Sequence, residues 1–171
     1  IHGRLVEGKT VYSAAAPTCT SCHGTHDIQP KAEPDSRVAR AHIPETCGGC
    51  HQREKTVFDK GKHGALLQAG MTAGPICSDC HGAHTIQRAS TPEWQNAVVG
   101  ACGNCHDDFI TSFRHTYHGK VATMGFGQVA TCASCHGAHD VRPASDPQSR
   151  VSPENRLETC PAGRFDDPAE C

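Results

Sequence analysis

A single short motif, Cys-x-x-Cys-His, occurs five times in this chain of 171 residues and constrains its fold more than any other feature. Two thiols at this spacing can each form a thioether to one vinyl group of the same porphyrin, and the adjoining imidazole can then bind the iron. The motif is the attachment signal for c-type haem, so we expect five haem c groups, each with its iron. The expected thioether cysteines and proximal histidines are Cys19, Cys22 and His23; Cys47, Cys50 and His51; Cys77, Cys80 and His81; Cys102, Cys105 and His106; and Cys132, Cys135 and His136.

Paired cysteines also occur in zinc ribbons, thioredoxin-like redox sites and disulfide scaffolds. None of these requires a histidine directly after the second cysteine. Histidine makes up 13 of the 171 residues, so five coincidences in that place would be very rare by chance. We therefore expect haem at all five motifs.

The motifs alternate between two kinds, so the repeating unit is a pair. The first, third and fifth motifs (the odd motifs) continue alike, as CHGTHDI, CHGAHTI and CHGAHDV. The second and fourth (the even motifs) have a phenylalanine eight residues and a His-Gly pair thirteen residues after the second cysteine. We expect a single multihaem domain over 1–171, with internal repeats at approximately 2–62, 63–117 and 118–171, the last one incomplete.

The composition indicates that haem fills the interior. Apolar residues make up 36% of the chain and aromatic residues 5%, which is little for a domain of this length. The Pro-rich segments QPKAEPDSRV, QRASTPEWQN and RPASDPQSRV after the odd motifs predict extended coil, and the segments after the even motifs predict short helices with Phe58 and Phe113 facing inward. We expect mostly coil with short α-helices, little or no β-structure, and closely packed haems as the core.

Charge and hydropathy argue against other classes of protein. Lys and Arg total 16 against 18 Asp and Glu, so the formal net charge is −2 and we expect no nucleic-acid partner. No apolar run approaches the ~20 residues of a membrane span. The chain begins at Ile1 rather than Met, which suggests processing or trimming, so the lack of a visible signal peptide says little about export.

Six of the eight remaining histidines stand in register with the motifs. Three precede a glycine ahead of an odd motif, and three lie three residues after a proximal histidine. We expect these histidines to bind the iron of the following motif from the distal side, so that each iron has two histidine ligands. The expected distal ligands are His2 for the haem of His23, His26 for that of His51, His63 for that of His81, His84 for that of His106, and His118 for that of His136.

Four other side chains are weaker candidates for iron. His42 and His115 lie outside the register, and His42 aligns with Asn155 in the last repeat, so we expect solvated side chains there. Met71 and Met124 are thioethers, which can act as axial ligands. They differ in register, and we expect them to pack against haem edges.

The five motifs, the His-Gly pairs and the CHGxH histidines together resemble those of the multihaem c-type cytochromes, over nearly all of residues 2–160. The resemblance implies electron transfer in anaerobic or extracellular respiration, with redox proteins or extracellular electron acceptors as partners. Covalent haem attachment takes place outside the cytoplasmic membrane, so we expect a periplasmic or extracellular protein. Some members of this broad group polymerise into extracellular filaments, and a subunit of such a head-to-tail nanowire is the alternative function.

An iron with two histidine ligands has no open position for a substrate. We therefore expect an electron carrier of low potential and not an enzyme. A multihaem oxidoreductase with one open haem is the third function considered.

The stretch around Cys160 approaches a sixth motif and does not complete it. The four residues that follow supply neither a second cysteine nor a histidine, and the next cysteine is Cys171. In an oxidising compartment we expect a disulfide between the two, with free thiols or a truncated parent chain as alternatives. His139 would serve the missing sixth haem, so we expect either an exposed histidine or a ligand offered in trans to a neighbouring subunit.

Overall fold

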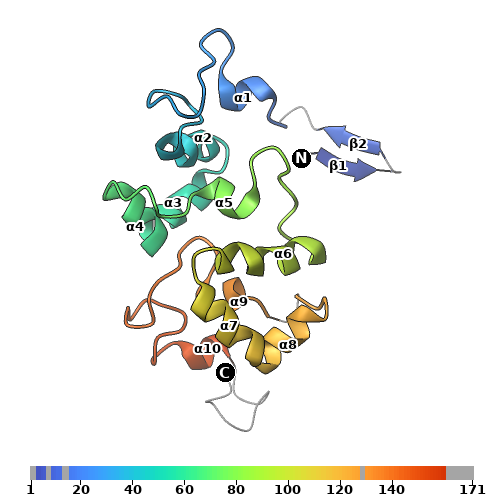
Figure 1. Cartoon of the computed structure of the whole chain (residues 1–171), viewed down its shortest axis with the longest axis vertical. Helices are drawn as coiled ribbons and strands as arrows, with labels where there is room; N and C mark the ends of the chain where they lie inside the picture. Colours follow the sequence, from blue (N-terminus) through green and yellow to red (C-terminus); the bar gives the residue numbers. More distant parts are fainter. Residues whose placement is uncertain (1–2, 7–8, 13–15, 128–129, 161–171) are drawn as a thin grey trace.

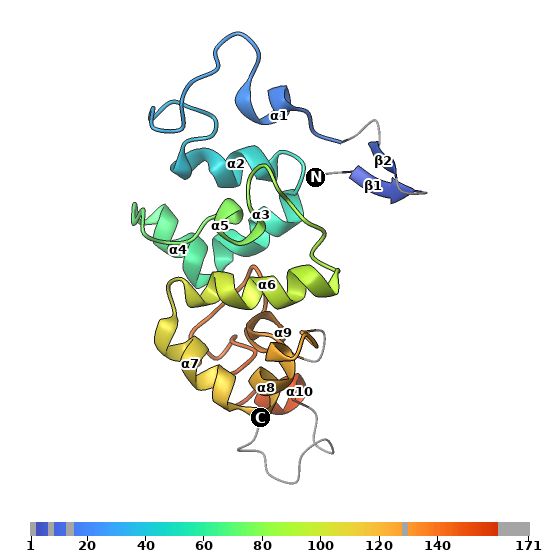
Figure 2. The ribbon, with the colours of Figure 1, turned by 45° about the vertical axis from the view of Figure 1, so that its right-hand side comes forward.

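The computed structural model describes residues 3–6, 9–12, 16–127 and 130–160. Over these residues the chain forms short helices, connecting coil and one antiparallel hairpin, which follow one another along an elongated molecule (Figures 1 and 2). The elements are β1 (Gly3–Val6), β2 (Lys9–Tyr12), α1 (Cys19–His23), η1 (Arg40–His42), α2 (Ile43–Gly48), α3 (Gln52–Lys60), α4 (Lys62–Gln68), α5 (Cys77–His81), α6 (Pro92–Gly103), α7 (Asp107–His115), α8 (Tyr117–Thr123), α9 (Cys132–His136) and α10 (Arg156–Thr159). The predicted fold class is confirmed, with β-structure limited to this hairpin among the described residues.

Each odd motif forms a five-residue helix of its own, namely α1, α5 or α9. The residue before the second cysteine is Ser or Asp in these motifs, and its side chain accepts a hydrogen bond from the backbone N–H just ahead of the helix. Such a bond satisfies an N–H group that the first turn would otherwise leave without a partner. The three bonds are Thr18 N to Ser21 Oγ (3.0 Å), Ile76 N to Asp79 Oδ2 (2.9 Å) and Thr131 N to Ser134 Oγ (3.0 Å).

The residue after the proximal histidine decides where the chain goes next. In the odd motifs it is a glycine with φ between 73° and 81°, a conformation that other residues rarely adopt, so the helix ends there. In the even motifs it is Gln52 or Asp107, and a nine-residue helix begins at that residue. The difference between odd and even motifs thus has a local backbone cause.

The glycine of each His-Gly pair lets two helices meet closely. A Cβ built on Gly64 of α4 would overlap the carbonyl oxygen of Phe58 in α3, and one on Gly119 of α8 would overlap that of Phe113 in α7. Only a residue without a side chain fits there, so His63 and His118 are held at equivalent places on the two helix pairs. Phe58 and Phe113 lie half-buried on α3 and α7, which were predicted as helices.

The segment QRASTPEWQN does not form the extended coil predicted for it. Helix α6 begins within it, at Pro92, and the Thr91 hydroxyl accepts a hydrogen bond from Trp94 N (3.3 Å). Thr as N-cap followed by Pro at the first helical position is a helix-start signal. That local signal outweighs the polar, Pro-containing composition on which the prediction rested.

The coils after the first and fifth motifs are built alike. The Ser36 hydroxyl donates to the carbonyl oxygen of Gln29 (3.1 Å), and Ser149 donates to that of Arg142 (3.3 Å). Both serines are buried. The incomplete third repeat therefore keeps the turn of the complete first one.

Little of the polypeptide is buried against itself. The chain exposes 11947 Å², whereas a compact monomer of 18.2 kDa would expose about 8,100 Å². The buried hydrophobic residues of the described part are few and mostly small: Ala39, Ile76, Val98, Ile110 and Ala130. The described residues therefore form no polypeptide core of ordinary size, which agrees with a core built around haem.

Candidate haem centres

The ten motif cysteines are free thiols in half-buried or exposed positions, as haem attachment requires. Cys160, which belongs to no complete motif, is disulfide-bonded. The bonded state predicted for Cys160 is therefore present, while Cys171 lies outside the described residues. The motif cysteines are therefore free to bind a haem, whereas Cys160, outside the complete motifs, is bonded.

Consecutive motifs are neighbours in space. Between the second and third motifs, the Cys77 thiol donates a hydrogen bond to Cys47, which lowers the pKa of Cys47 to about 7 and raises that of Cys77. The fourth and fifth motifs meet in the same way: Cys132 donates to Cys102, which lowers the pKa of Cys102 and raises that of Cys132. The two contacts are related by a shift of 55 residues.

The two other junctions also bring motif cysteines close. Burial and then the nearby Cys47 raise the pKa of Cys22, which links the first and second motifs. Burial, then Asp79 and Cys105, raise the pKa of Cys80, which links the third and fourth. The five attachment turns therefore form one row in sequence order along the molecule (Figure 2).

Three histidine pairs face each other across the repeats, and each contains one motif histidine and one of the expected register histidines. The ring centroids lie 6.0–6.3 Å apart, with interplanar angles of 6°, 33° and 36°. The pairs are His23 with His84, His106 with His63, and His81 with His139.

This separation fits a metal between the two rings. An imidazole nitrogen lies about 2.0–2.1 Å from a bound metal and roughly 1.1 Å from its own ring centroid, so two ligands on opposite sides have centroids about 6.2 Å apart. Ordinary aromatic pairs also lie within about 4.5–7 Å, so the distance alone does not decide. Each of these three pairs joins a motif histidine to a register histidine, and two of the three are related by the repeat, as axial ligation of a haem would require.

The order of partners differs from the predicted one. His84 faces His23 and not His106, whereas His63 faces His106 and not His81. His139 faces His81 of the same chain, in neither of the two roles expected for it. The first and third motifs thus each meet the CHGxH histidine of the next odd motif.

A backbone contact explains this order. After the positive-φ glycine, the loop that carries His139 runs back to the start of α4, where the Lys62 N–H donates to the carbonyl oxygen of Val141 (2.8 Å). The His139 carbonyl packs against Gly61, 2.7 Å from where a Cβ would stand. A loop reaching back one repeat cannot be read from residue spacing alone, which is why the sequence suggested a different partner.

Burial keeps several of these imidazoles neutral, which is the form that binds metals. It lowers the pKa of His63, and the facing His106 lowers it further. It also lowers the pKa of His81, with further contributions from His139 and His51. The pKa of His136 is lowered by burial and then by His106.

The other predicted ligands are placed as follows. His26 and His136 are exposed, and neither ring contacts a second imidazole among the described residues. His118 lies half-buried on α8 beside Tyr117, at a ring-centroid distance of 5.9 Å. His2 lies outside the described residues.

His42 has a role that needs no iron. Its Nδ1 lies 2.9 Å from the carbonyl oxygen of Ser36, inside the turn of the first repeat. In the third repeat Asn155 makes the same contact, donating to the Ser149 carbonyl oxygen at 2.9 Å. The place therefore takes any side chain that can donate there, and His42 is bonded rather than only solvated.

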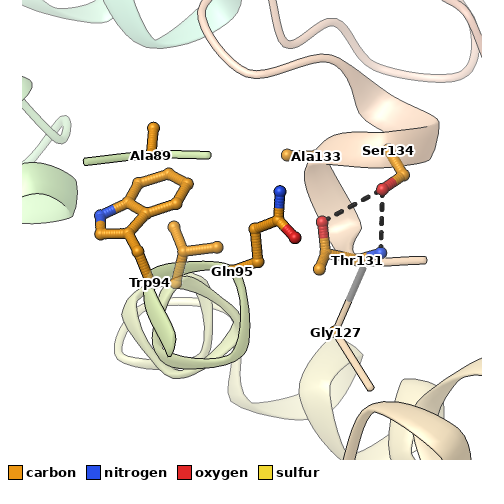
Figure 3. A pocket seen from close by; sticks show the side chains of 8 residues that line it. Ala89, Trp94, Gln95, Gly127, Thr131, Ala133 and Ser134 are labelled. Carbon is orange, nitrogen blue, oxygen red and sulfur yellow. Dashed lines mark hydrogen bonds between the residues drawn. The ribbon is translucent and has the colours of Figure 1, made fainter. Parts of the chain in front are cut away.

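A hollow of about 210 Å³ lies beside the fifth motif, between α6 and α9 (Figure 3). Trp94 and Gln95 line it from α6, and Thr131 and Ser134 line it from the opposite side. The Trp94 ring is also nearly parallel to His81, at a centroid distance of 5.2 Å. Trp94 was not among the predicted site residues, although it is the single tryptophan of an aromatic-poor chain.

A zinc site has less support. Structural zinc needs four converging ligands. Among the described residues, no three His, Cys, Asp or Glu side chains converge in a way that could hold a metal ion. Imidazoles facing in pairs, with two thiols beside each motif histidine, suit a porphyrin instead.

Comparison with known proteins agrees with this chemistry. No curated protein and no solved structure matches the chain. Proteins of the c-type cytochrome class are typically exported, and none of the helices in the described part is long and apolar enough to cross a membrane. A family model for the doubled CXXCH motif matches residues 68–111, which contain the third and fourth motifs. That match supports a multihaem c-type cytochrome with covalently bound haem c, a class that transfers electrons.

Proposed function

We propose that this protein carries electrons along a row of five covalent c-type haems, each held between two histidines, and that it has no catalytic function. The observation that carries the proposal is the set of three facing histidine pairs at 6.0–6.3 Å. A haem between two such imidazoles supplies a one-electron ferric/ferrous couple of low potential. Imidazoles on both sides of such a haem would bind its iron and would keep substrates from the metal.

The rest of the chain keeps the sites close together. The attachment turns touch through Cys47 and Cys77, and again through Cys102 and Cys132. A row of adjacent sites of one chemical kind suits electron transfer from end to end. The partners are redox proteins or extracellular acceptors outside the cytoplasmic membrane.

The repeat also suggests a partner for His51. His63 faces the even motif histidine His106, and His2 occupies the same His-Gly register one repeat earlier. We therefore assign His2 to the haem of His51. By the same register His118 belongs to the incomplete motif at Cys160.

Intact mass and electron paramagnetic resonance test the proposal together. The mass of the native protein should exceed that of the polypeptide by five haem masses, and the oxidised haems of the three facing pairs should be low-spin. A count of four or six haems, or a high-spin signal from any of those three haems, would contradict it.

One observation favours an oxidoreductase as the second candidate function. The ring of His136 contacts no second imidazole among the described residues, as an open haem would require. Rapid, stoichiometric binding of carbon monoxide to a single reduced haem of the native protein would favour that function. Lack of such binding would favour the carrier.

A further inference from the structure

The third motif has an aromatic neighbour that lies outside the histidine pairs. The indole ring of Trp94 in α6 lies nearly parallel to the imidazole of His81, with an interplanar angle of 8° and a centroid distance of 5.2 Å. His139 faces the same imidazole at 6.1 Å, with an angle of 36°. His81 therefore has two ring partners, one at a distance that suits a shared metal and one stacked on its face.

The place of Trp94 in the repeat is occupied by small residues elsewhere. Trp94 stands eight residues before Cys102, and the residues eight before Cys47 and Cys160 are Ala39 and Ser152, both buried. The segment between the motif histidine and the following cysteine is also three residues shorter in the second repeat than in the first and third. The second repeat thus places a large flat ring where the other two bury a small side chain.

Hydrogen bonds at two places fix the start of α6 and with it the indole. The Thr91 hydroxyl accepts a hydrogen bond from Trp94 N (3.3 Å). Two residues further on, the Asn96 side chain donates to the carbonyl oxygen of Gly125 (2.8 Å) and accepts from the N–H of Gly127 (2.6 Å). These contacts belong to the polypeptide alone, so they position the ring independently of a bound group, as a side chain that orients a ligand requires.

The aromatic neighbour of the fourth motif is of a different kind. Phe109 lies three residues after His106, with ring centroids 5.8 Å apart and an angle of 49°, and its side chain is 73% exposed. A tilted, exposed ring leaves an imidazole room to turn. The half-buried Trp94 is parallel to its imidazole, so rotation of the His81 ring about a bond to a metal would drive the edge of that ring into the indole.

We propose that Trp94 is a positioning residue for the third haem: it holds the plane of the His81 imidazole and thereby sets the potential and the magnetic axes of that haem. The inference rests on the proposed function, because it needs a haem on Cys77 and Cys80. Groups that contact a metal ligand orient the ligand and tune the metal. The indole also keeps water from His81, and water favours ferric haem, whose charge is more positive by one unit. Loss of the indole should therefore lower the potential of this haem.

The experiment compares two substitutions in the full haem-loaded protein. Trp94→Phe keeps a flat ring, whereas Trp94→Leu keeps an apolar side chain without one. For Trp94→Leu we expect one haem of the five to shift to lower potential in a redox titration, with changed and broadened g values in its low-spin resonance. Trp94→Phe should stay close to the native protein in both measurements.

Two further variants make the result specific. Gln95 lines the same hollow as Trp94 from the next position of α6 (Figure 3), so Gln95→Ala enlarges that hollow and leaves the stacked rings in place. It should leave all five potentials and resonances unchanged. His139→Met replaces the histidine that faces His81, so it should change the same spectral component as Trp94→Leu and thereby identify the affected haem.

Several outcomes would overturn the inference. Native values in Trp94→Leu, or equal changes in Trp94→Phe and Trp94→Leu, would show that the flat ring does not position His81. Shifts spread over several haems, or the same shift in Gln95→Ala, would indicate a general effect on packing. Failure of the proposed function would look different, because the native protein would then lack the haem on Cys77 and Cys80 by mass, or would hold it in a high-spin state.

Discussion

Single histidines mark the proposed metal positions of this chain, and the histidines that face them come from distant parts of the sequence. His84 meets His23 and His139 meets His81, each across an entire repeat, and His63 meets His106. Substituting one distal histidine should therefore change a haem that is attached far away along the chain. Because the substituted histidine and the affected haem lie far apart in the sequence, each histidine pair can be tested separately.

His63→Met should raise the potential of the haem on Cys102 and Cys105. A thioether favours reduced iron over an imidazole, and axial ligands set haem potentials over about 0.8 V, so we expect a rise on the order of 0.1 V. A redox titration followed by resonance spectroscopy assigns the shifted haem. His42→Asn should leave all potentials in place. A shift at the haem of Cys77 and Cys80 would restore the order expected from the sequence.

At the scale of elements, neighbouring helices and turns are fixed by close backbone contacts and by the hydrogen bonds of one half-exposed arginine. Arg40 of η1 donates to the carbonyl oxygens of Thr72 and Gly74 (2.7 and 2.8 Å) and pairs with Asp79 of α5 (2.6 Å). These bonds hold the first repeat against the third motif, where His84 must reach His23. The relative positions of these elements therefore determine which histidines can face each other.

Gly64→Ala should destabilise the protein by roughly 2–4 kcal/mol, because its Cβ would overlap the Phe58 carbonyl at the α3–α4 contact. Urea unfolding of the haem-loaded protein measures the change. Gly100→Ala is the matched control: it lies within α6 with no atom within 4 Å of its built Cβ, and alanine favours helix there by about 0.5–1 kcal/mol. Equal effects of the two substitutions would contradict this account of the His-Gly pairs.

The Arg40–Asp79 pair should make a pH-dependent contribution to stability. Burial opposes ionisation of Asp79, but hydrogen bonds from Arg40 and from Ile76 N outweigh it and lower the pKa of Asp79. A lowered pKa in the folded state means that the contribution is complete above the unfolded value of about 3.9 and is lost as pH falls through the folded value.

We expect Asp79→Asn to cost about 0.5–1 kcal/mol at pH 7, since both side chains are partly exposed. The difference in free energy of unfolding between the native protein and the variant should shrink below about pH 4. Urea unfolding at several pH values measures it. A difference that grows as pH falls would refute the sign.

The whole molecule exposes far more surface than a compact protein of its mass, 11947 Å² against about 8,100 Å². The buried apolar residues of its described part are few and mostly small, so this part of the polypeptide contributes little hydrophobic stabilisation of its own. The row of motifs instead runs along the long axis, where bound groups would replace the missing core. Stability and electron transfer then depend on the same groups.

The haem-free polypeptide should therefore not fold cooperatively. Chain produced without haem attachment, with its cysteines kept reduced, should lose most of its helical circular dichroism and unfold in urea without a sigmoidal transition. The haem-loaded protein is the control and should unfold cooperatively. A cooperative transition in the haem-free chain would show that the polypeptide core is sufficient.

The sequence by itself determined the chemistry and the local structure. Two thiols and an imidazole at one spacing admit a single common cofactor, and Gly24 or Gln52 after the proximal histidine decides whether a helix ends or begins. Thr91 and Pro92 together are a helix-start signal that the sequence already contains, although the polar composition around them suggested coil. All these signals are short-range, so residue order expresses them fully.

Only the tertiary structure decided which histidines meet. The sequence placed His139 as a spare, and the folded chain sets it against His81 because the loop after the fifth motif runs back to Lys62 and Gly61. A loop of this kind can reach forwards or backwards with the same residues. The direction of the loop depends on contacts between residues about 80 positions apart in the sequence. The spacing of residues within one repeat does not reveal such contacts.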